Sequence, residues 1–317
     1  MPLIRWSERF RRPPLKMTID PYLRPEDHPI ECDAKARKPR LVPLVVLDYG
    51  SVAARFRQVK YIRHDMAGAL RELLRSSRDI QNNPYNGKTS IDAATLREVE
   101  DYARSLGVTD IGYTVVDPRH IFQGFRILFP NAMVFTMEMD AEKIRQAPTI
   151  PSFIEIFRTY AQLGVVVNRV ADFLREKGYN AHPAPAIAGE VNFIPLAIDA
   201  GLGISGKNGL LITPGNGPRV RLAAVFTDIE NLPYAVEKPH GWVREFCETC
   251  NSCVRHCPAG AIYERTRAHP DGGPVFIDHT KCADPFSNDN GCTLCIKHCP
   301  FSYGDYDAIK ARYEATL

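Results

Sequence analysis

Long hydrophobic runs and a strong excess of charge are both missing from this chain. No stretch of eighteen apolar residues occurs, so the sequence predicts no helix that spans a bilayer. A net charge of only +3, without long blocks of one sign, does not favour nucleic acid as a partner. An arginine pair lies between Phe10 and Lys16, but acids and prolines follow where an export signal needs an apolar core. We therefore expect a cytoplasmic protein in which residues 1–43 form an extended, proline-rich segment.

Cysteine is almost absent from the first 246 residues and dense in the last quarter. Cys32 stands alone in a charged, proline-rich stretch and is interpreted as a spare thiol. The other eight cysteines form two runs, Cys-x2-Cys-x2-Cys-x3-Cys-Pro and Cys-x9-Cys-x2-Cys-x3-Cys-Pro. In chain order they are Cys247, Cys250, Cys253, Cys257, Cys282, Cys292, Cys295 and Cys299.

The first run has the spacing of two-cluster bacterial ferredoxins, in which the cysteine before proline ligates the other cluster. This pattern predicts two [4Fe–4S] clusters, one held by Cys247, Cys250, Cys253 and Cys299, the other by Cys282, Cys292, Cys295 and Cys257. Structural zinc would favour two separated cysteine pairs, and disulfides would favour a small secreted chain, so both are disfavoured. The long spacing after Cys282 leaves two alternatives open: another ligand replaces it, or that cluster is labile.

Apolar periodicity predicts an α+β domain over residues 44–241. Steps of three and four residues predict helices, and short β-branched runs predict strands. The expected helices cover 53–78, 90–107, 151–178 and 192–200, and the expected strands cover 110–116, 132–139, 210–213 and 219–228. Residues 242–303 then pair a strand with each cysteine run in a ferredoxin-like module, and residues 304–317 form a tail. A cluster module attached to a domain of that size normally delivers electrons to something bound there.

Four glycines lie close together at Gly201, Gly203, Gly206 and Gly209. Their spacing superficially fits a dinucleotide fingerprint and a phosphate-binding loop. Asn208 stands where the latter needs Ser or Thr, and a strand-like run follows where both need a helix, so both are rejected. Two interpretations remain, a bare backbone surface for a flat ligand or a plain turn between a helix and a strand.

The block from Ala200 to Asp228, together with the second cysteine run through Phe301, resembles the cobalamin-dependent reductive dehalogenases and the related epoxyqueuosine reductases. The resemblance covers residues 160–304 and is closer to the dehalogenases. It implies a nitroreductase-like corrinoid-binding domain followed by a two-cluster ferredoxin-like module. The cobalamin would be bound base-off, and because the chain has no Asp-x-His-x-x-Gly segment, no histidine ligand to cobalt is expected.

The resemblance also implies site residues. A tyrosine proton donor with a basic neighbour corresponds to Tyr160 and to Arg219 or Arg221, since a phenol beside a cation has a lowered pKa. The implied cofactor contacts are Gly201, Gly203, Gly206, Lys207, Asn208, Gly209 and Thr213.

The leading hypothesis is an oxidoreductase: a corrinoid- and iron–sulfur-dependent enzyme that reductively cleaves a small substrate, with dehalogenation as one form of that reaction. A ferredoxin- or flavodoxin-type donor would supply its electrons. One alternative is an electron-transfer or activating protein for a partner. Another is epoxide reduction on tRNA, although Ile187 stands where epoxyqueuosine reductases place a catalytic aspartate and Glu190 is the nearest carboxylate.

Overall fold

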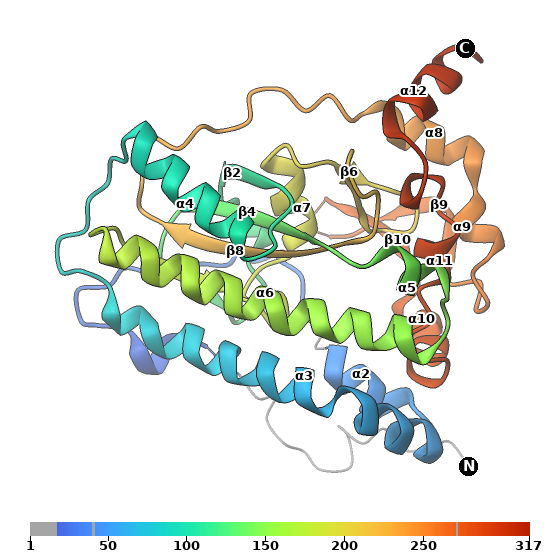
Figure 1. The fold of residues 1–317 in the computed structure, drawn as a ribbon, viewed down its shortest axis with the longest axis horizontal. Coiled ribbons are helices and arrows are strands. Elements are labelled where there is room, and N and C mark those ends of the chain that lie inside the picture. Colours follow the sequence, from blue (N-terminus) through green and yellow to red (C-terminus); the bar gives the residue numbers. More distant parts are fainter. Residues whose placement is uncertain (1–17, 40–41, 271) are drawn as a thin grey trace.

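The computed structural model describes residues 18–39, 42–270 and 272–317, and the arginine pair at residues 11–12 lies outside these ranges. The α-helices are α2 (Val42–Tyr49), α3 (Val52–Arg78), α4 (Ala93–Ser105), α5 (Ala141–Arg145), α6 (Ile150–Glu176), α7 (Phe193–Asp199), α8 (Trp242–Cys250), α9 (Ser252–Arg255), α10 (His279–Asn288), α11 (Leu294–Lys297) and α12 (Tyr306–Glu314) (Figure 1). The strands are β1 (Ile30–Glu31), β2 (Ile111–Val115), β3 (Arg126–Ile127), β4 (Asn131–Glu138), β5 (His182–Ala184), β6 (Ile204–Ser205), β7 (Leu211–Ile212), β8 (Val220–Thr227), β9 (Ile262–Ala268) and β10 (Pro274–Ile277). Short 3-10 helices cover Asp20–Tyr22, Asp79–Asn82, Pro118–His120 and Pro300–Ser302.

An antiparallel sheet with the strand order β2-β4-β8-β5 forms the centre of the larger domain. Successive side chains of a strand face opposite sides, so β4 buries Met133 and Phe135 on one face of the sheet and Ala132 and Val134 on the other. Each face therefore has its own apolar core.

Helices cover both faces of this sheet. Apolar side chains of α4 and α6 fill the first core, and α3 packs along the outer side of α6 (Figure 1). The second core is closed by α7 and by the segment 116–127. The α+β prediction is confirmed.

The long helices match the sequence periodicity closely, whereas short elements do not. The helix predicted from a Ser90 cap begins instead after Asp92, whose carboxylate accepts hydrogen bonds from the amides of Ala94 and Thr95. Strand β5 was not predicted, because its three residues include Pro183. Proline is tolerated there because β5 lies at the edge of the sheet.

The cysteine-rich module follows at one end of the sheet (Figure 1). Its two strands, β9 and β10, pair with each other in an antiparallel hairpin. Helix α12 packs against α8, and the ring of Trp242 contacts Tyr306 and Tyr313. None of the helices among the described residues is both long and apolar enough to cross a membrane.

Candidate functional site

The glycine-rich block folds into a small hairpin of β6 and β7. A side chain at Gly203 would place its Cβ 2.2 Å from the carbonyl oxygen of Ile212, so the two backbones approach too closely for any residue but glycine. Gly209 has a positive φ of 74°, which also favours glycine. A strand follows the turn, in agreement with the rejection of both nucleotide motifs.

One cavity beside this hairpin contains Tyr160, and we call it the tyrosine cavity. It has a volume of about 310 Å³ and is lined by α6, by the start of β8, by the loop 186–194 and by Leu210 of the hairpin. The guanidinium carbon of Arg221 lies 4.6 Å from the centre of the Tyr160 ring, which is the geometry of a cation–π contact. The Nε atom of Arg221 is buried without a hydrogen-bond partner. A polar reactant in this cavity would therefore meet both a phenol and a cation.

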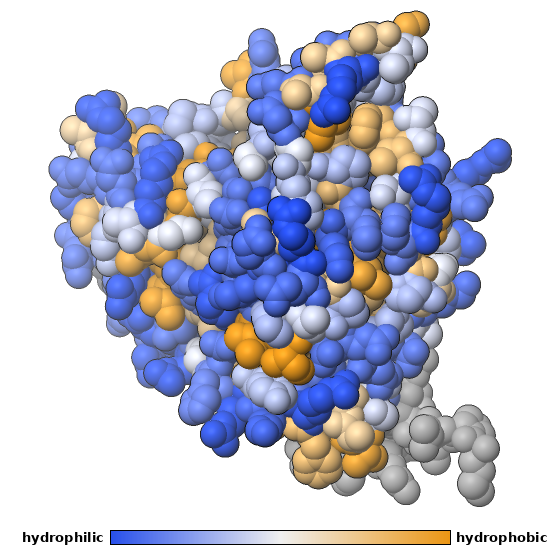
Figure 2. Space-filling view, turned by 45° about the vertical axis from the view of Figure 1, so that its right-hand side comes forward, coloured by the Kyte–Doolittle hydropathy of each residue, from blue (hydrophilic) through white to orange (hydrophobic). Residues whose placement is uncertain are grey.

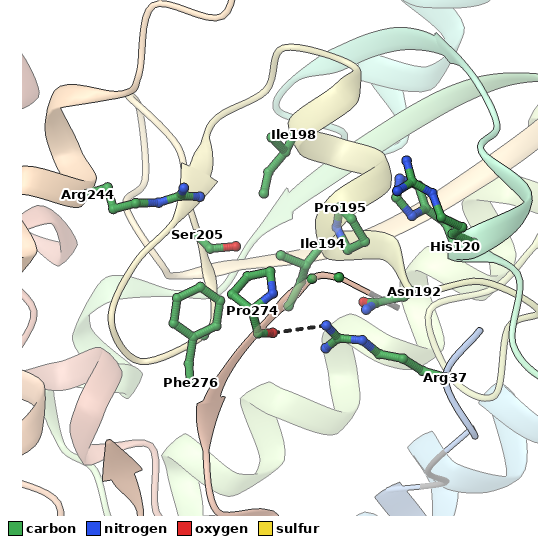
Figure 3. A pocket seen from close by; sticks show the side chains of 14 residues that line it. Arg37, His120, Asn192, Ile194, Pro195, Ile198, Ser205, Arg244, Pro274 and Phe276 are labelled. Carbon is green, nitrogen blue, oxygen red and sulfur yellow. Dashed lines mark hydrogen bonds between the residues drawn. The ribbon is translucent and has the colours of Figure 1, made fainter. Parts of the chain in front are cut away.

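A second cavity, the arginine cavity, adjoins the first and shares Asn192 and Ile194 with it. Its volume is about 280 Å³. Arg37 and Arg244 reach into it from opposite sides (Figure 3). Arg37 donates a hydrogen bond of 3.0 Å to the carbonyl of Pro274. The arrangement suits an anionic or strongly polar group between the two guanidinium groups.

Two other basic side chains of the arginine cavity are held by carboxylates. Arg119 donates to Asp117, and this hydrogen bond lowers the pKa of Asp117. His120 lies 2.8 Å from Asp199, which also accepts a 3.0 Å hydrogen bond from Lys238. Because Arg119 and His120 are held in this way, Arg244 is the better candidate for binding an anion, with Arg37 on the other side of the cavity.

Four thiols of the cysteine-rich module share a third, much smaller hollow of about 20 Å³. They are Cys247, Cys250, Cys253 and Cys299. Burial, followed by repulsion from the thiols of Cys247 and Cys250, raises the pKa of Cys253 to about 11. Neutral thiols packed this tightly fit a site at which a metal centre replaces their protons.

The other four thiols form a second group. Burial raises the pKa of Cys282 to about 11, with added repulsion from Cys292 and Cys257. Burial, followed by repulsion from Cys282, Cys292, Cys253 and Cys257, also raises the pKa of Cys295. Cys257 thus lies with the second run and Cys299 with the first, as the ferredoxin spacing predicts.

The second thiol group lies next to the tyrosine cavity. Cys295, Tyr160 and Leu210 pack against one apolar cluster, which also contains Ile62 of α3 and Ile296 of α11. The hairpin therefore lies between the tyrosine cavity and the cysteine module.

Several residues predicted as cofactor contacts point toward the cysteine module instead. The ammonium of Lys207 is buried and binds Glu248 at 2.9 Å and Asn251 at 2.7 Å. The amide of Asn208 lies 3.5 Å from the carbonyl of Cys295. The hydroxyl of Thr213 is used within its own turn. These three side chains are absent from the walls of both cavities described above.

Arg219 and Arg221 also differ in position. Arg219 donates to the carbonyls of Ser302 and Met139, at 2.6 and 2.9 Å, so it ties β8 to the cysteine module. Of the two candidate arginines, Arg221 is the one that lies in the tyrosine cavity. Sequence reasoning missed Arg37, Arg244 and Asn192, which come from separate elements and carry no local motif.

A glycine after the hairpin permits a close contact with the module. At Gly217, where φ is 55°, an added Cβ would lie 2.2 Å from the carbonyl oxygen of Phe301, just after Cys299. We expect Gly217→Ala to cost about 3 kcal/mol and to lower the apparent temperature of anaerobic thermal unfolding. Gly215→Ala is the matched control, since its Cβ would meet nothing within 4 Å. Equal unfolding temperatures for the two variants would show that this contact is unimportant.

Comparison with protein families agrees with the cysteine geometry. Residues 246–303, which include all eight clustered cysteines, match the family of 4Fe–4S dicluster domains. The chain therefore contains a two-cluster iron–sulfur module at its C-terminal end.

Whole-chain comparisons find two groups of relatives. A tetrachloroethene reductive dehalogenase of Desulfitobacterium hafniense is 34% identical over 211 residues, which cover 62% of this chain and 37% of that protein. An epoxyqueuosine reductase of Listeria monocytogenes is 25% identical over 265 residues, which cover 68% of this chain and 67% of that protein. The chain thus spans little more than a third of the length of the dehalogenases that it matches.

Solved structures of reductive dehalogenases share the fold. One, reported to suggest a mechanism for B12-dependent dehalogenation, has a TM-score of 0.67 and 19% identity, covering 94% of this chain and 46% of that chain. The catabolic dehalogenase NpRdhA in complex with 3-bromo-4-hydroxybenzoic acid has a TM-score of 0.66 and 20% identity, covering 92% and 45% of the two chains. By its iron–sulfur module and these relatives, the chain is homologous to the reductive dehalogenases and the epoxyqueuosine reductases.

Proposed function

We propose that this chain is a corrinoid- and iron–sulfur-dependent reductase that removes a halide from a small organic substrate. The observation that carries the proposal is the position of Tyr160, which lines the tyrosine cavity and packs against the same apolar cluster as Cys295. A proton source and an electron source thus lie close to one cavity. Identity of 34% with dehalogenases, against 25% with an epoxyqueuosine reductase, favours halide removal over epoxide reduction.

The eight clustered cysteines are the proposed cluster ligands. Cys247, Cys250, Cys253 and Cys299 hold one cluster, and Cys257, Cys282, Cys292 and Cys295 hold the other. The second cluster would lie nearer the tyrosine cavity, because Cys295 packs against the same apolar cluster as Tyr160 and Leu210. The backbone amide of Lys207 donates to the sulfur of Cys247, and this hydrogen bond lowers a thiol pKa that burial raises. Such hydrogen bonds stabilise the anionic form of a sulfur ligand.

The linings of the two adjoining cavities suit a corrinoid in their chemistry. The macrocycle is broad and largely apolar at its faces, which matches the wall of the tyrosine cavity and the hairpin backbone at Gly209. Its nucleotide tail carries a phosphodiester, which matches the two guanidinium groups of Arg37 and Arg244. A bound corrinoid would supply cobalt that accepts electrons from the clusters and cleaves a carbon–halogen bond.

The chain's own residues supply the proton. Replacement of halogen by hydrogen consumes two electrons and one proton and releases one halide ion. The Tyr160 hydroxyl donates that proton to the carbon that loses the halide, and Arg221 above the ring stabilises the phenolate that remains. Each cluster carries one electron, so two clusters can deliver the pair.

Halide release tests this function. The protein, prepared anaerobically with both clusters and with added cobalamin, is supplied with a chemical reductant and with tetrachloroethene or 3-bromo-4-hydroxybenzoic acid. We expect one halide ion for every two electrons consumed. If neither probe nor any other organohalide loses halide, while the reduced clusters pass electrons to a partner protein, the electron-transfer alternative is correct.

Arg244 provides a test of the cofactor position alone. We expect Arg244→Gln to weaken cobalamin binding about tenfold or more, because a charge-assisted hydrogen bond to the phosphodiester is lost. Binding of cobinamide, which lacks the nucleotide tail, should not change. Arg119→Gln is the matched control, since Arg119 lines the same cavity but is held by Asp117. Equal losses for cobalamin and cobinamide would contradict this placement of the tail.

A further inference from the structure

Helix α3 exposes an apolar stripe that the proposed function does not use. Val52, Phe56, Val59, Leu70 and Leu74 are 67%, 77%, 51%, 38% and 55% exposed. Their separations of four, three, eleven and four residues place them on one side of an α-helix. The buried side of α3, with Ala54, Ile62 and Leu73 at most 6% exposed, adjoins this stripe around the helix. The helix therefore has an apolar stripe that the described residues leave exposed.

α3 lies at the periphery of the part of the chain that the structure describes. α3 forms one edge of the molecule, on the outer side of α6 (Figure 1). Its 27 residues correspond to about 40 Å of helix. Figure 2 shows hydrophobic side chains gathered near the lower edge of the molecule. A single straight helix at an edge is convex, so it suits a flat surface better than a pocket.

Charge shows which kind of surface would fit. The sequence of α3 contains seven Arg and Lys residues and two Asp and Glu residues. Lys60, Arg63 and Arg71 are exposed, and Arg63 lies four residues after Val59, within the stripe. A second copy docked through the same stripe would bring these cations together, which is unfavourable. The occupant that complements the stripe is therefore anionic as well as apolar.

We propose that α3 binds an anionic lipid surface and lies in the plane of the membrane interface. Phe56 and the other apolar side chains of the stripe would enter the boundary between headgroups and acyl chains. Lys60, Arg63 and Arg71 would contact the lipid phosphates. The proposal does not depend on the corrinoid or on the reaction, because α3 contributes no side chain to either cavity wall.

Vesicle co-sedimentation tests the proposal with the cluster-loaded protein. Vesicles of phosphatidylcholine alone are compared with vesicles that also contain phosphatidylglycerol. We expect sedimentation with the anionic vesicles only, and a loss that increases with salt. Phe56→Ser should lower the partition coefficient about tenfold, and Lys60→Gln, Arg63→Gln and Arg71→Gln about fivefold each.

The control replaces two exposed side chains elsewhere, Tyr85→Ser with Val236→Ser, and should leave binding unchanged. Iron content and the visible spectrum verify that every variant is folded. Equal binding to both kinds of vesicle, or binding that survives the α3 substitutions, would refute the proposal. A salt-resistant dimer in analytical ultracentrifugation that Phe56→Ser dissociates would identify a second copy as the occupant instead.

Discussion

Phenylalanine in place of Tyr160 is expected to lower kcat for halide release by about 10²- to 10⁴-fold, the usual contribution of a positioned proton donor. The substitution removes one oxygen and leaves the ring beneath Arg221, so the cation–π contact persists. Halide release is measured at saturating reductant, and the electron consumption is measured in parallel. Because cofactor binding does not need the hydroxyl, cobalamin affinity should remain within about twofold of the wild type.

Tyr102→Phe is the matched control for this prediction. Tyr102 stacks on Phe173 in the first core, away from both cavities, and should tolerate loss of its hydroxyl. The proton-donor role of Tyr160 fails if Tyr160→Phe keeps full activity. It also fails if Arg221→Gln abolishes activity while Tyr160→Phe does not, since the cation would then act directly on the substrate.

Alanine in place of Cys257 is expected to remove the second cluster, although Cys257 belongs to the first run. In the crossed arrangement this thiol lies with Cys282 and Cys292. The iron content should fall from eight to about four atoms per chain, and halide release should be lost because the cluster beside the tyrosine cavity is gone.

Two further variants make this test specific. Cys299→Ala should remove the first cluster, so the electron paramagnetic resonance spectra of the two reduced variants should differ. Cys32→Ala is the control, because Cys32 packs against the second apolar core and lies outside the cluster module, and it should keep all the iron. Loss of the same cluster in Cys257→Ala and Cys247→Ala would contradict the crossed ligation.

The cysteine pattern predicted the module well, because cluster ligands are constrained by spacing along the chain. The extents of the long helices α3 and α6 were predicted for a similar reason, since their apolar positions recur at helical spacing. The expectation that these positions form one buried stripe on α3 was partly wrong, because Phe56, Val59 and Leu70 are exposed. The pairing of Cys257 with the second run followed from the known spacing rule and agrees with the burial and mutual repulsion of these thiols.

The cavity walls were much harder to predict, because they depend on tertiary packing. Arg219 and Arg221 are two residues apart, so strand periodicity predicts that both side chains lie on the same face of the sheet. The structure distinguishes them, because Arg219 lies just before β8 and its guanidinium group donates a hydrogen bond to the carbonyl of Ser302. Lys207 lies in a glycine-rich motif that suggests a ligand site. Its ammonium group instead donates hydrogen bonds to Glu248 of α8 and to Asn251, the residue after this helix. Arg37 and Arg244 meet only because distant segments close around one cavity.

Cobalt retention tests the central claim most directly. The protein is loaded anaerobically with both clusters, incubated with cobalamin, freed of excess cofactor by gel filtration, and analysed for cobalt, iron and visible absorption. We predict about one cobalt for every eight iron atoms, with the absorption of a base-off corrinoid. Eight iron atoms with no retained cobalt would contradict the account, because the two cavities would then hold something other than a corrinoid.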